Sequence, residues 1–227
     1  MTSPRELAAR TRPAVVLADE TCTDILSKVI ADAFFDPAVS RWLIPGPAER
    51  RRIFPGHFRI YVEHALSDGM VHTTASRDAV ALWLPVGEEP APPPAWYDQR
   101  LAAVTGPWVH RFRVFDETLD RHHLTGTAHH HLAILAVRPD RQGRGLGSAL
   151  LAAHHAALDR EGISAYLEAS SIRSRRLYTA HGYDACGDPI VLPGGVMFPM
   201  VRQPRTAEDK EHHHPAIRAD QGREAAP

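Results

Sequence analysis

The stretch from residue 129 to residue 162 constrains the fold more than any other part of the chain. Residues 129–137 end in a nearly continuous apolar run, which predicts a buried strand. A polar, glycine-rich loop follows over residues 138–145, and apolar residues then recur at helical spacing until Gly162. A buried strand, a glycine loop and an amphipathic helix in this order predict an α/β domain.

The rest of the chain supplies further elements for one domain over residues 13–202. Alternating or apolar runs predict strands over 13–18, 70–74, 79–84, 165–169, about 183–186 and 196–202. Helical spacing predicts helices over 25–34, 47–66 with a break at Pro55-Gly56, 108–119 and 171–181. Residues 87–127 open with a proline-rich connector and are expected to form an insertion that acts as a substrate wall or lid. Polar composition predicts a flexible N-terminus over 1–12 and a disordered tail over 203–227, with three histidines at 212–214.

Composition excludes several classes of function. Lys and Arg total 26 against 27 Asp and Glu, so a net charge of -1 argues against nucleic acid or an anionic membrane as partner. No apolar stretch is long enough for a transmembrane helix, and the N-terminus lacks the apolar core of a signal peptide. Two cysteines make neither a disulfide framework nor a zinc site. We expect a cytoplasmic protein, monomeric or homodimeric.

The glycine loop is the candidate site. Glycines allow a backbone to approach a ligand closely, and the first turn of the following helix offers unpaired amides and a positive dipole end to a diphosphate. A P-loop is excluded because no lysine precedes Ser148. A dinucleotide fingerprint fits poorly, since residues 138–142 separate the strand from Gly143 and about 130 residues precede the loop. A coenzyme A loop is the third interpretation.

The same residues resemble a known family. The pattern Gln142-x-x-Gly145-x-Gly147 is similar to the signature of the GNAT superfamily of acetyl-CoA-dependent N-acetyltransferases. A second block, residues 166–171 followed by residues 177–183, resembles the family's later strand, its helix with a Leu-Tyr pair and its Gly-aromatic exit. More faintly, residues 33–37 and 79–83 resemble the puromycin N-acetyltransferase-like branch.

The resemblance implies a GNAT-like mixed central sheet, with flanking helices and two central strands that splay apart around acetyl-CoA. The thioester would lie beside the backbone of the 129–137 strand, with Val137 N–H toward its oxygen, and the diphosphate on the loop amides. The expected cofactor-binding residues are Leu135, Val137, Gln142, Gly143, Arg144, Gly145, Gly147 and Ser148. Tyr178 is the expected general acid for the leaving thiolate, although it could instead only pack its ring in the core.

The acceptor amine must lose a proton, and Glu168 is the leading candidate for the base, with His130 as a weaker one. His130 and Trp83 are the expected substrate contacts. The histidines at 129–131 alternate across two faces of a strand, so we expect no metal site. Asp116, Glu117 and Asp120 could attract a cationic amine or form the wet side of their helix.

Taken together, these features predict an enzyme that moves an acetyl group from acetyl-CoA to a primary amine of a small molecule, such as an antibiotic or other metabolite, through a tetrahedral intermediate. Two departures from the puromycin-like branch, Ser174 for Asn and His130 for Trp, argue against puromycin itself. The alternatives are a protein or peptide N-acetyltransferase and a catalytically silent acyl-CoA-binding module. The insertion argues mildly against the first, and Tyr178 argues against the second.

Overall fold

The computed structural model describes residues 13–205, so the termini predicted to be flexible lie almost wholly outside the described residues. One mixed sheet runs in the order β1-β2-β3-β4-β5-β8-β6, and β7 pairs with β8. Only β4 and β5 pair in parallel; the other described pairs are antiparallel. The strands are β1 Val15–Leu17, β2 Met70–Thr74, β3 Ala79–Val86, β4 His129–Val137, β5 Ser164–Ala169, β6 Asp184–Ala185, β7 Ile190–Leu192 and β8 Gly195–Arg202.

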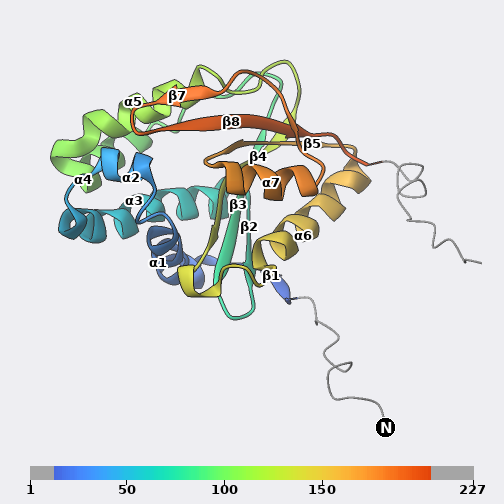
Figure 1. Cartoon of the computed structure of the whole chain (residues 1–227), viewed down its shortest axis with the longest axis horizontal. Helices are drawn as coiled ribbons and strands as arrows, with labels where there is room; N and C mark the ends of the chain where they lie inside the picture. Colours follow the sequence, from blue (N-terminus) through green and yellow to red (C-terminus); the bar gives the residue numbers. More distant parts are fainter. Residues whose placement is uncertain (1–12, 206–227) are drawn as a thin grey trace, which may run out of the picture.

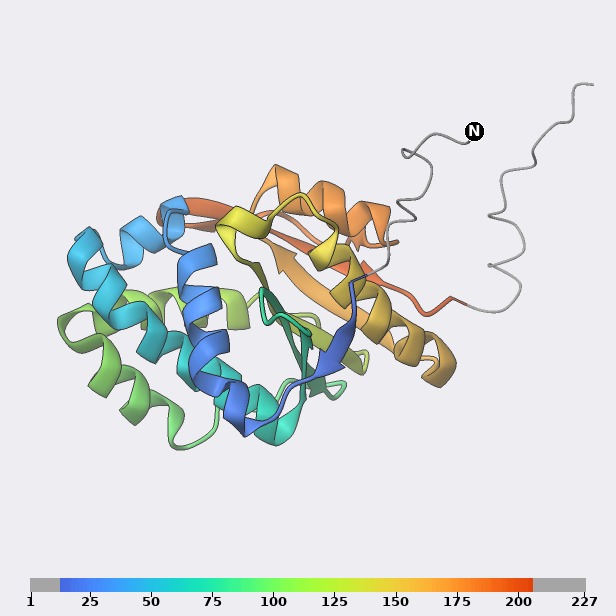
Figure 2. The same ribbon diagram turned by 90° about the horizontal axis from the view of Figure 1, so that it is seen from below.

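Helices cover both faces of the sheet (Figures 1 and 2). On one face lie α1 Thr23–Ala33, α2 Ala38–Leu43, α3 Pro47–Asp68, α4 Tyr97–Thr105 and α5 Val109–Asp120. On the other lie α6 Leu146–Glu161 and α7 Ile172–Ala180. Each set buries its apolar side chains against the sheet, so the molecule has two principal cores, here called the α3 face and the α6 face. This arrangement confirms the predicted mixed α/β fold.

Pro55 does not break α3, contrary to the sequence prediction. Proline removes one helical hydrogen bond, yet the helix continues from Pro47 to Asp68. Phe54 and Phe58, on either side of this position, are buried in the core against α1 and pack edge to face. Burial of these aromatic side chains stabilises the helix enough to offset the lost bond.

The central strands separate, as the resemblance implied. β4 pairs with β5 at three positions only, the last of which is His131 with Tyr166. Beyond this point β4 continues to Val137 and β5 to Ala169 without pairing to each other. Their outer edges remain paired with β3 and β8, so the two halves of the sheet diverge around an unpaired inner edge.

A buried ion pair ties the last strand to α6. Arg202 at the end of β8 and Asp159 on α6 are 2.7 Å apart, and both side chains are more than nine-tenths buried. The backbone N–H of Arg205 also donates to Asp159 at 2.8 Å.

Within residues 13–205, no helix combines the length and the apolar character needed to cross a membrane.

Candidate active site

The loop between β4 and α6 presents free backbone amides. Gly143 and Gly145 have φ angles of 75° and 78°, in the left-handed region that favours glycine. Gly145 is also the N-cap of α6 and therefore offers no side chain to the amides of the first turn. The loop thus presents unpaired N–H groups and the positive end of a 16-residue helix at one point, which is a favourable place for a diphosphate.

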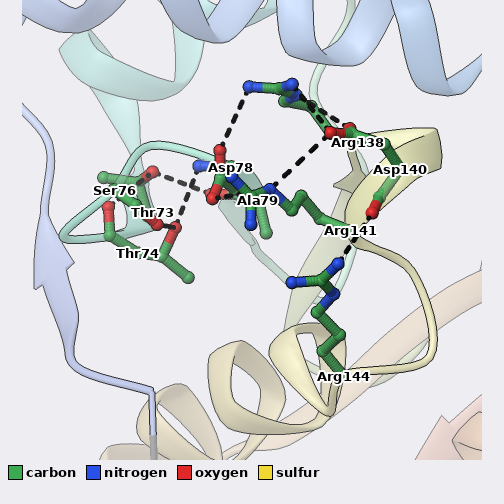
Figure 3. A network of polar contacts seen from close by, with 9 residues as sticks. All are labelled: Thr73, Thr74, Ser76, Asp78, Ala79, Arg138, Asp140, Arg141 and Arg144. Atoms are coloured by element: carbon green, nitrogen blue, oxygen red, sulfur yellow. Dashed lines mark hydrogen bonds and ion pairs between the residues drawn. The ribbon is translucent and has the colours of Figure 1, made fainter.

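A polar network fixes the start of this loop (Figure 3). Arg138 lies between Asp78 and Asp140, with contacts of 3.3 Å and 2.9 Å to their carboxylates. Arg141 lies 3.6 Å from Asp78, and Arg144 donates to the carbonyl of Asp140 at 3.4 Å. Three arginines and two aspartates leave one net positive charge, so the network holds the turn in place and adds a positive potential beside the free amides further along.

The backbone of β4 aims polar groups into the gap beside β5. Arg138 N–H donates to Asp78 on the β3 side at 2.9 Å. In an antiparallel ladder alternate residues point their N–H and C=O groups to opposite sides, so those of Val137 and Leu135 point toward β5. Gln142 supports this orientation, because its side-chain amide donates to the Val137 carbonyl at 3.3 Å. The expected cofactor-binding residues therefore form one continuous strip from the gap to the start of α6.

Tyr178 lies on α7 beside the same gap. Its side chain is buried against Tyr183, with ring centroids 5.8 Å apart, and its hydroxyl has no hydrogen-bond partner among the described residues. Burial and the nearby Glu168 carboxylate raise the pKa of Tyr178 well above its ordinary value. The phenol therefore stays protonated and free to donate.

Glu168 faces two histidines on the α3 face. His131 Nε2 lies 2.9 Å from one carboxylate oxygen, and His123 Nδ1 lies 3.6 Å from the other. Burial raises the pKa of the Glu168 carboxyl, but His131 and His123 outweigh it and hold that pKa well below the ordinary range. Glu168 is thus a buried, ionised carboxylate, and the imidazoles of His131 and His123 lie against its two oxygens.

A second acidic group lies on α5 between two tyrosines. Tyr97 donates to Asp116 at 2.9 Å, and Tyr61 lies 3.5 Å from the other carboxylate oxygen. Burial is the main reason that the pKa of Asp116 rises to about 7. The pKa of Asp120 is raised by partial burial and responds to the charges of His123 and Glu168, so the end of α5 lies close to the Glu168 cluster.

The two residues expected to contact the substrate lie on the other face of the sheet. Trp83 is fully buried and stacks on His154 of α6, with ring centroids 4.2 Å apart. His130 Nδ1 lies 3.0 Å from His154 Nε2. Both side chains therefore lie on the α6 face, opposite Glu168, with Trp83 enclosed in the core and His130 half-buried, and we propose neither as a substrate contact.

A β-bulge in β4 is the physical reason that His130 lies on this face. Leu82 pairs with Ile134 but Trp83 pairs with Leu132, so β4 carries one extra residue at Ala133. Without the bulge, His130 would share a face with Ile134 and Ala136 on the α3 side. The extra residue reverses the alternation and brings His131 to Glu168 instead.

Sequence reasoning missed His131, His123, Tyr61 and Tyr97. The alternation of the three histidines separated His131 from His130, but the facing residue on β5 depends on strand register, which alternation alone does not give. His123 follows α5 and reaches the cluster only through the path of the insertion, whose ends are joined by Gly126 N–H to Glu88 at 2.7 Å. The two tyrosines carry no local signal of function.

Comparisons with known proteins agree with this geometry. The family model described as an acetyltransferase (GNAT) domain matches residues 122–203, which contain the gap, the loop and both candidate catalytic residues. This domain makes the protein an acyltransferase. More narrowly, residues 122–203 form a GNAT domain, the domain of N-acetyltransferases that use acetyl-CoA as acyl donor.

Three solved structures illustrate the similarity of fold. A histone acetyltransferase HPA2 and related acetyltransferase from Corynebacterium glutamicum is 24% identical, covering 86% of this chain and 98% of its own, with a TM-score of 0.65. Arylalkylamine N-acetyltransferase 2 from Aedes aegypti is 13% identical over 86% of this chain and 100% of its own, with a TM-score of 0.59. An agmatine N-acetyltransferase is 16% identical over 84% of this chain and 98% of its own, with a TM-score of 0.53.

Proposed function

We propose that this enzyme acetylates primary amines of small molecules, with His131 and Glu168 acting together as the base. The observation that carries the proposal is the 2.9 Å contact between His131 and the buried Glu168 carboxylate at the point where β4 and β5 separate. A carboxylate only accepts hydrogen bonds, so Nε2 of His131 donates to it and Nδ1 is left as the basic atom.

Proton removal is the first requirement of the reaction. An alkyl amine with a lysine-like pKa of about 10.4 is almost entirely protonated at pH 7, and its deprotonation costs about 4.6 kcal/mol. The His131 side chain is 19% exposed and that of Glu168 only 7%, so the imidazole is the part of the pair that an amine can reach. Glu168 orients the imidazole and stabilises the cation that forms when Nδ1 takes the proton.

Two further groups act on the acyl donor. Acetyl-CoA supplies the acetyl group as a thioester. Val137 N–H is proposed to hold the oxygen that becomes negative during attack, an effect worth about 2.7–4 kcal/mol for one such donor. Tyr178 is proposed to protonate the leaving sulfur, since its hydroxyl is protonated and unpaired. The diphosphate is proposed to rest on the amides of residues 142–148.

Cationic small amines are the proposed acceptor class. Asp116 and Asp120 place acidic groups along α5 near the Glu168 cluster, and the Tyr61 and Tyr97 rings lie beside Asp116. The names of two structures of similar fold, an arylalkylamine and an agmatine acetyltransferase, suggest the same class. The insertion over 87–127 is proposed as the wall of the amine site.

Membership of the puromycin N-acetyltransferase-like branch and a cytoplasmic location of the protein both stay predictions.

The test is release of free thiol from acetyl-CoA in the presence of a panel of arylalkylamines, guanidinoalkylamines, polyamines, aminonucleosides and peptides. We expect turnover with small amines, and about 100-fold lower kcat for His131→Ala, the lower end of the effect of a general base. His130→Ala is the matched control, because it removes the neighbouring imidazole from the other face of the strand.

Three results would overturn all or part of the proposal. Turnover restricted to peptides would favour the protein acetyltransferase, and acetyl-CoA binding without turnover on any amine would favour the silent module. Equal loss of activity in folded His130→Ala and His131→Ala would remove the special role of His131.

A further inference from the structure

Three metal-ligating side chains converge at the inner edge of the β4–β5 gap. They come from three separate elements: His131 from β4, Glu168 from β5 and His123 from the turn after α5. One ligand atom from each lies within 4.8 Å of the others. His123 and Glu168 side chains are 11% and 7% exposed, and His131, at 19%, is the most open member of the group.

Hydrogen bonds around the cluster fix which nitrogen of His123 faces Glu168 with a free lone pair. His129 Nδ1 lies 2.8 Å from the carbonyl of Thr127, which can only accept, so His129 carries its proton there. Its Nε2 is then an acceptor at 3.1 Å from His123 Nε2, and His123 must donate. In neutral His123 the other ring nitrogen, Nδ1, therefore carries no proton, and its lone pair points at Glu168.

The facing carboxylate oxygen is also without a donor. Glu168 Oε1 is buried and has no hydrogen-bond partner among the described residues. Its distance to His123 Nδ1 is 3.6 Å, too long for a hydrogen bond. Two electron-rich atoms that face each other in a buried place indicate that a positive charge belongs between them, either the proton of a cationic His123 or a metal ion.

The spacing fits a four-coordinate ion. Zinc bonds to His nitrogen and carboxylate oxygen are about 2.0–2.1 Å long, which separates neighbouring ligands of a tetrahedron by about 3.3 Å. His123 Nδ1 lies 3.6 Å from Oε1 of Glu168 and His131 Nε2 lies 2.9 Å from Oε2, so the contacts to the two carboxylate oxygens lie on either side of this value. All three ligand atoms lie within 4.8 Å of one another. Two imidazoles and one carboxylate suit zinc better than magnesium or calcium, which prefer oxygen ligands.

We propose that His123, His131 and Glu168 form a binding site for Zn²⁺, with the fourth position open toward the gap. The second-sphere contact already exists, because His123 donates its other N–H to His129 and thereby holds its ring in the orientation of a ligand. The ion would replace the proton that His131 shares with Glu168, so its binding would inhibit the acetyl transfer proposed above. This consequence rests on the proposed function, but binding of the ion does not.

Calorimetric titration of the full chain with zinc chloride tests the site without any turnover. The background protein carries alanine at 212, 213 and 214, since three consecutive histidines there would bind metal by themselves. We expect one ion per chain, and affinity at least about tenfold lower in His123→Ala and in His131→Ala. His122→Ala is the matched control, because its ring contacts the carbonyl of Thr118 and not the cluster.

Thermal unfolding with and without zinc gives a second, independent measurement. An ion that binds only the folded state raises Tm, so zinc should stabilise the background protein and His122→Ala but not His123→Ala. The site would be overturned if the background protein bound no zinc. It would also be overturned if the folded His123→Ala and His131→Ala variants bound zinc as tightly as the background protein does. Since thiol release is measured separately on metal-free protein, failure of the zinc site and failure of the proposed acetyl transfer are distinguishable.

Discussion

Single side chains on the two faces of the sheet divide the chemistry between them. The protonated, unpaired hydroxyl of Tyr178 lies on the α6 face, and the His131–Glu168 pair lies on the α3 face. The β4–β5 gap separates the two, so one side can serve the leaving sulfur and the other the incoming amine. Tyr178 and Glu168 could be selected from the sequence because the resemblance covers them. His131 could not, because its place beside Glu168 depends on the bulge at Ala133, which the sequence does not reveal.

Tyr178→Phe tests the acid directly. The change keeps the ring that packs against Tyr183 and removes only a hydroxyl that bonds to no described residue. We expect kcat to fall by about 100-fold or more while the Kd for acetyl-CoA changes by less than about threefold. Steady-state kinetics and calorimetry measure the two quantities. Unchanged kcat would show that another group, or water, protonates the sulfur.

Elements rather than single side chains form the proposed anion site, since backbone amides would supply its donors. The sequence was sufficient to predict β4, the loop and α6, because the apolar run, the glycines and the helical spacing are all local signals. It did not predict α2, α4 or β7, which are short and take their stability from packing on α3, α5 and β8.

Two glycines of the loop provide a matched pair. Gly145 has a positive φ, so Gly145→Ala strains the backbone by about 1–2 kcal/mol and shifts the amides at the start of α6. Gly147 lies inside the helix, where an added Cβ would make ordinary contacts of 3.7–3.9 Å. We expect at least about tenfold weaker acetyl-CoA binding for Gly145→Ala and nearly unchanged binding for Gly147→Ala, measured by calorimetry. The reverse order would argue that the diphosphate does not lie on these amides.

Helix α5 is expected to make stability depend on pH. The pKa of Asp116 rises from 3.8 to about 7 on folding, mainly through burial, so the folded protein binds a proton that the unfolded chain releases. The contribution of this group to the free energy of unfolding is therefore largest below about pH 4 and is lost as pH rises toward 7. The amide introduced by Asp116→Asn cannot ionise, so this variant should not lose stability in this way as the pH rises.

Denaturant unfolding between pH 4.5 and pH 8 measures the effect. The stability of Asp116→Asn relative to the parent should increase with pH, by up to about 4 kcal/mol, and level off above pH 7. Glu117→Gln, an exposed change on the same helix, is the control and should alter the pH dependence only slightly, because the Glu117 charge is a minor cause of the raised pKa of Asp116. A constant difference across this range would show that Asp116 is ionised in the folded protein.

At the scale of the whole molecule, the sheet order and register are what join residues far apart in the chain into one site. His123, His131, Glu168 and Tyr178 come from four elements, and their convergence depends on pairing between β4 and β5 and between β5 and β8. Periodicity gives the strands but not their partners, and a shift of one residue exchanges the two faces. This is why the fold class could be predicted while the amine side of the site could not.

The link between β8 and α6 should matter for global stability. Asp159→Ala leaves Arg202 buried without its partner and removes the acceptor of Arg205 N–H. We expect the free energy of unfolding to fall by about 3–5 kcal/mol, as measured by denaturant titration. Asp98→Ala, which breaks an exposed pair with Arg113, should change the free energy of unfolding far less. Similar losses in both variants would mean that the buried pair has no special role.

A crystal structure of the protein with bound coenzyme A tests the central claim most directly. We expect the diphosphate within hydrogen-bond distance of the amides of residues 143–148, the pantetheine along Leu135 and Val137 in the β4–β5 gap, and the sulfur beside the Tyr178 hydroxyl. A diphosphate bound away from this loop, or a pantetheine outside the gap, would contradict the account.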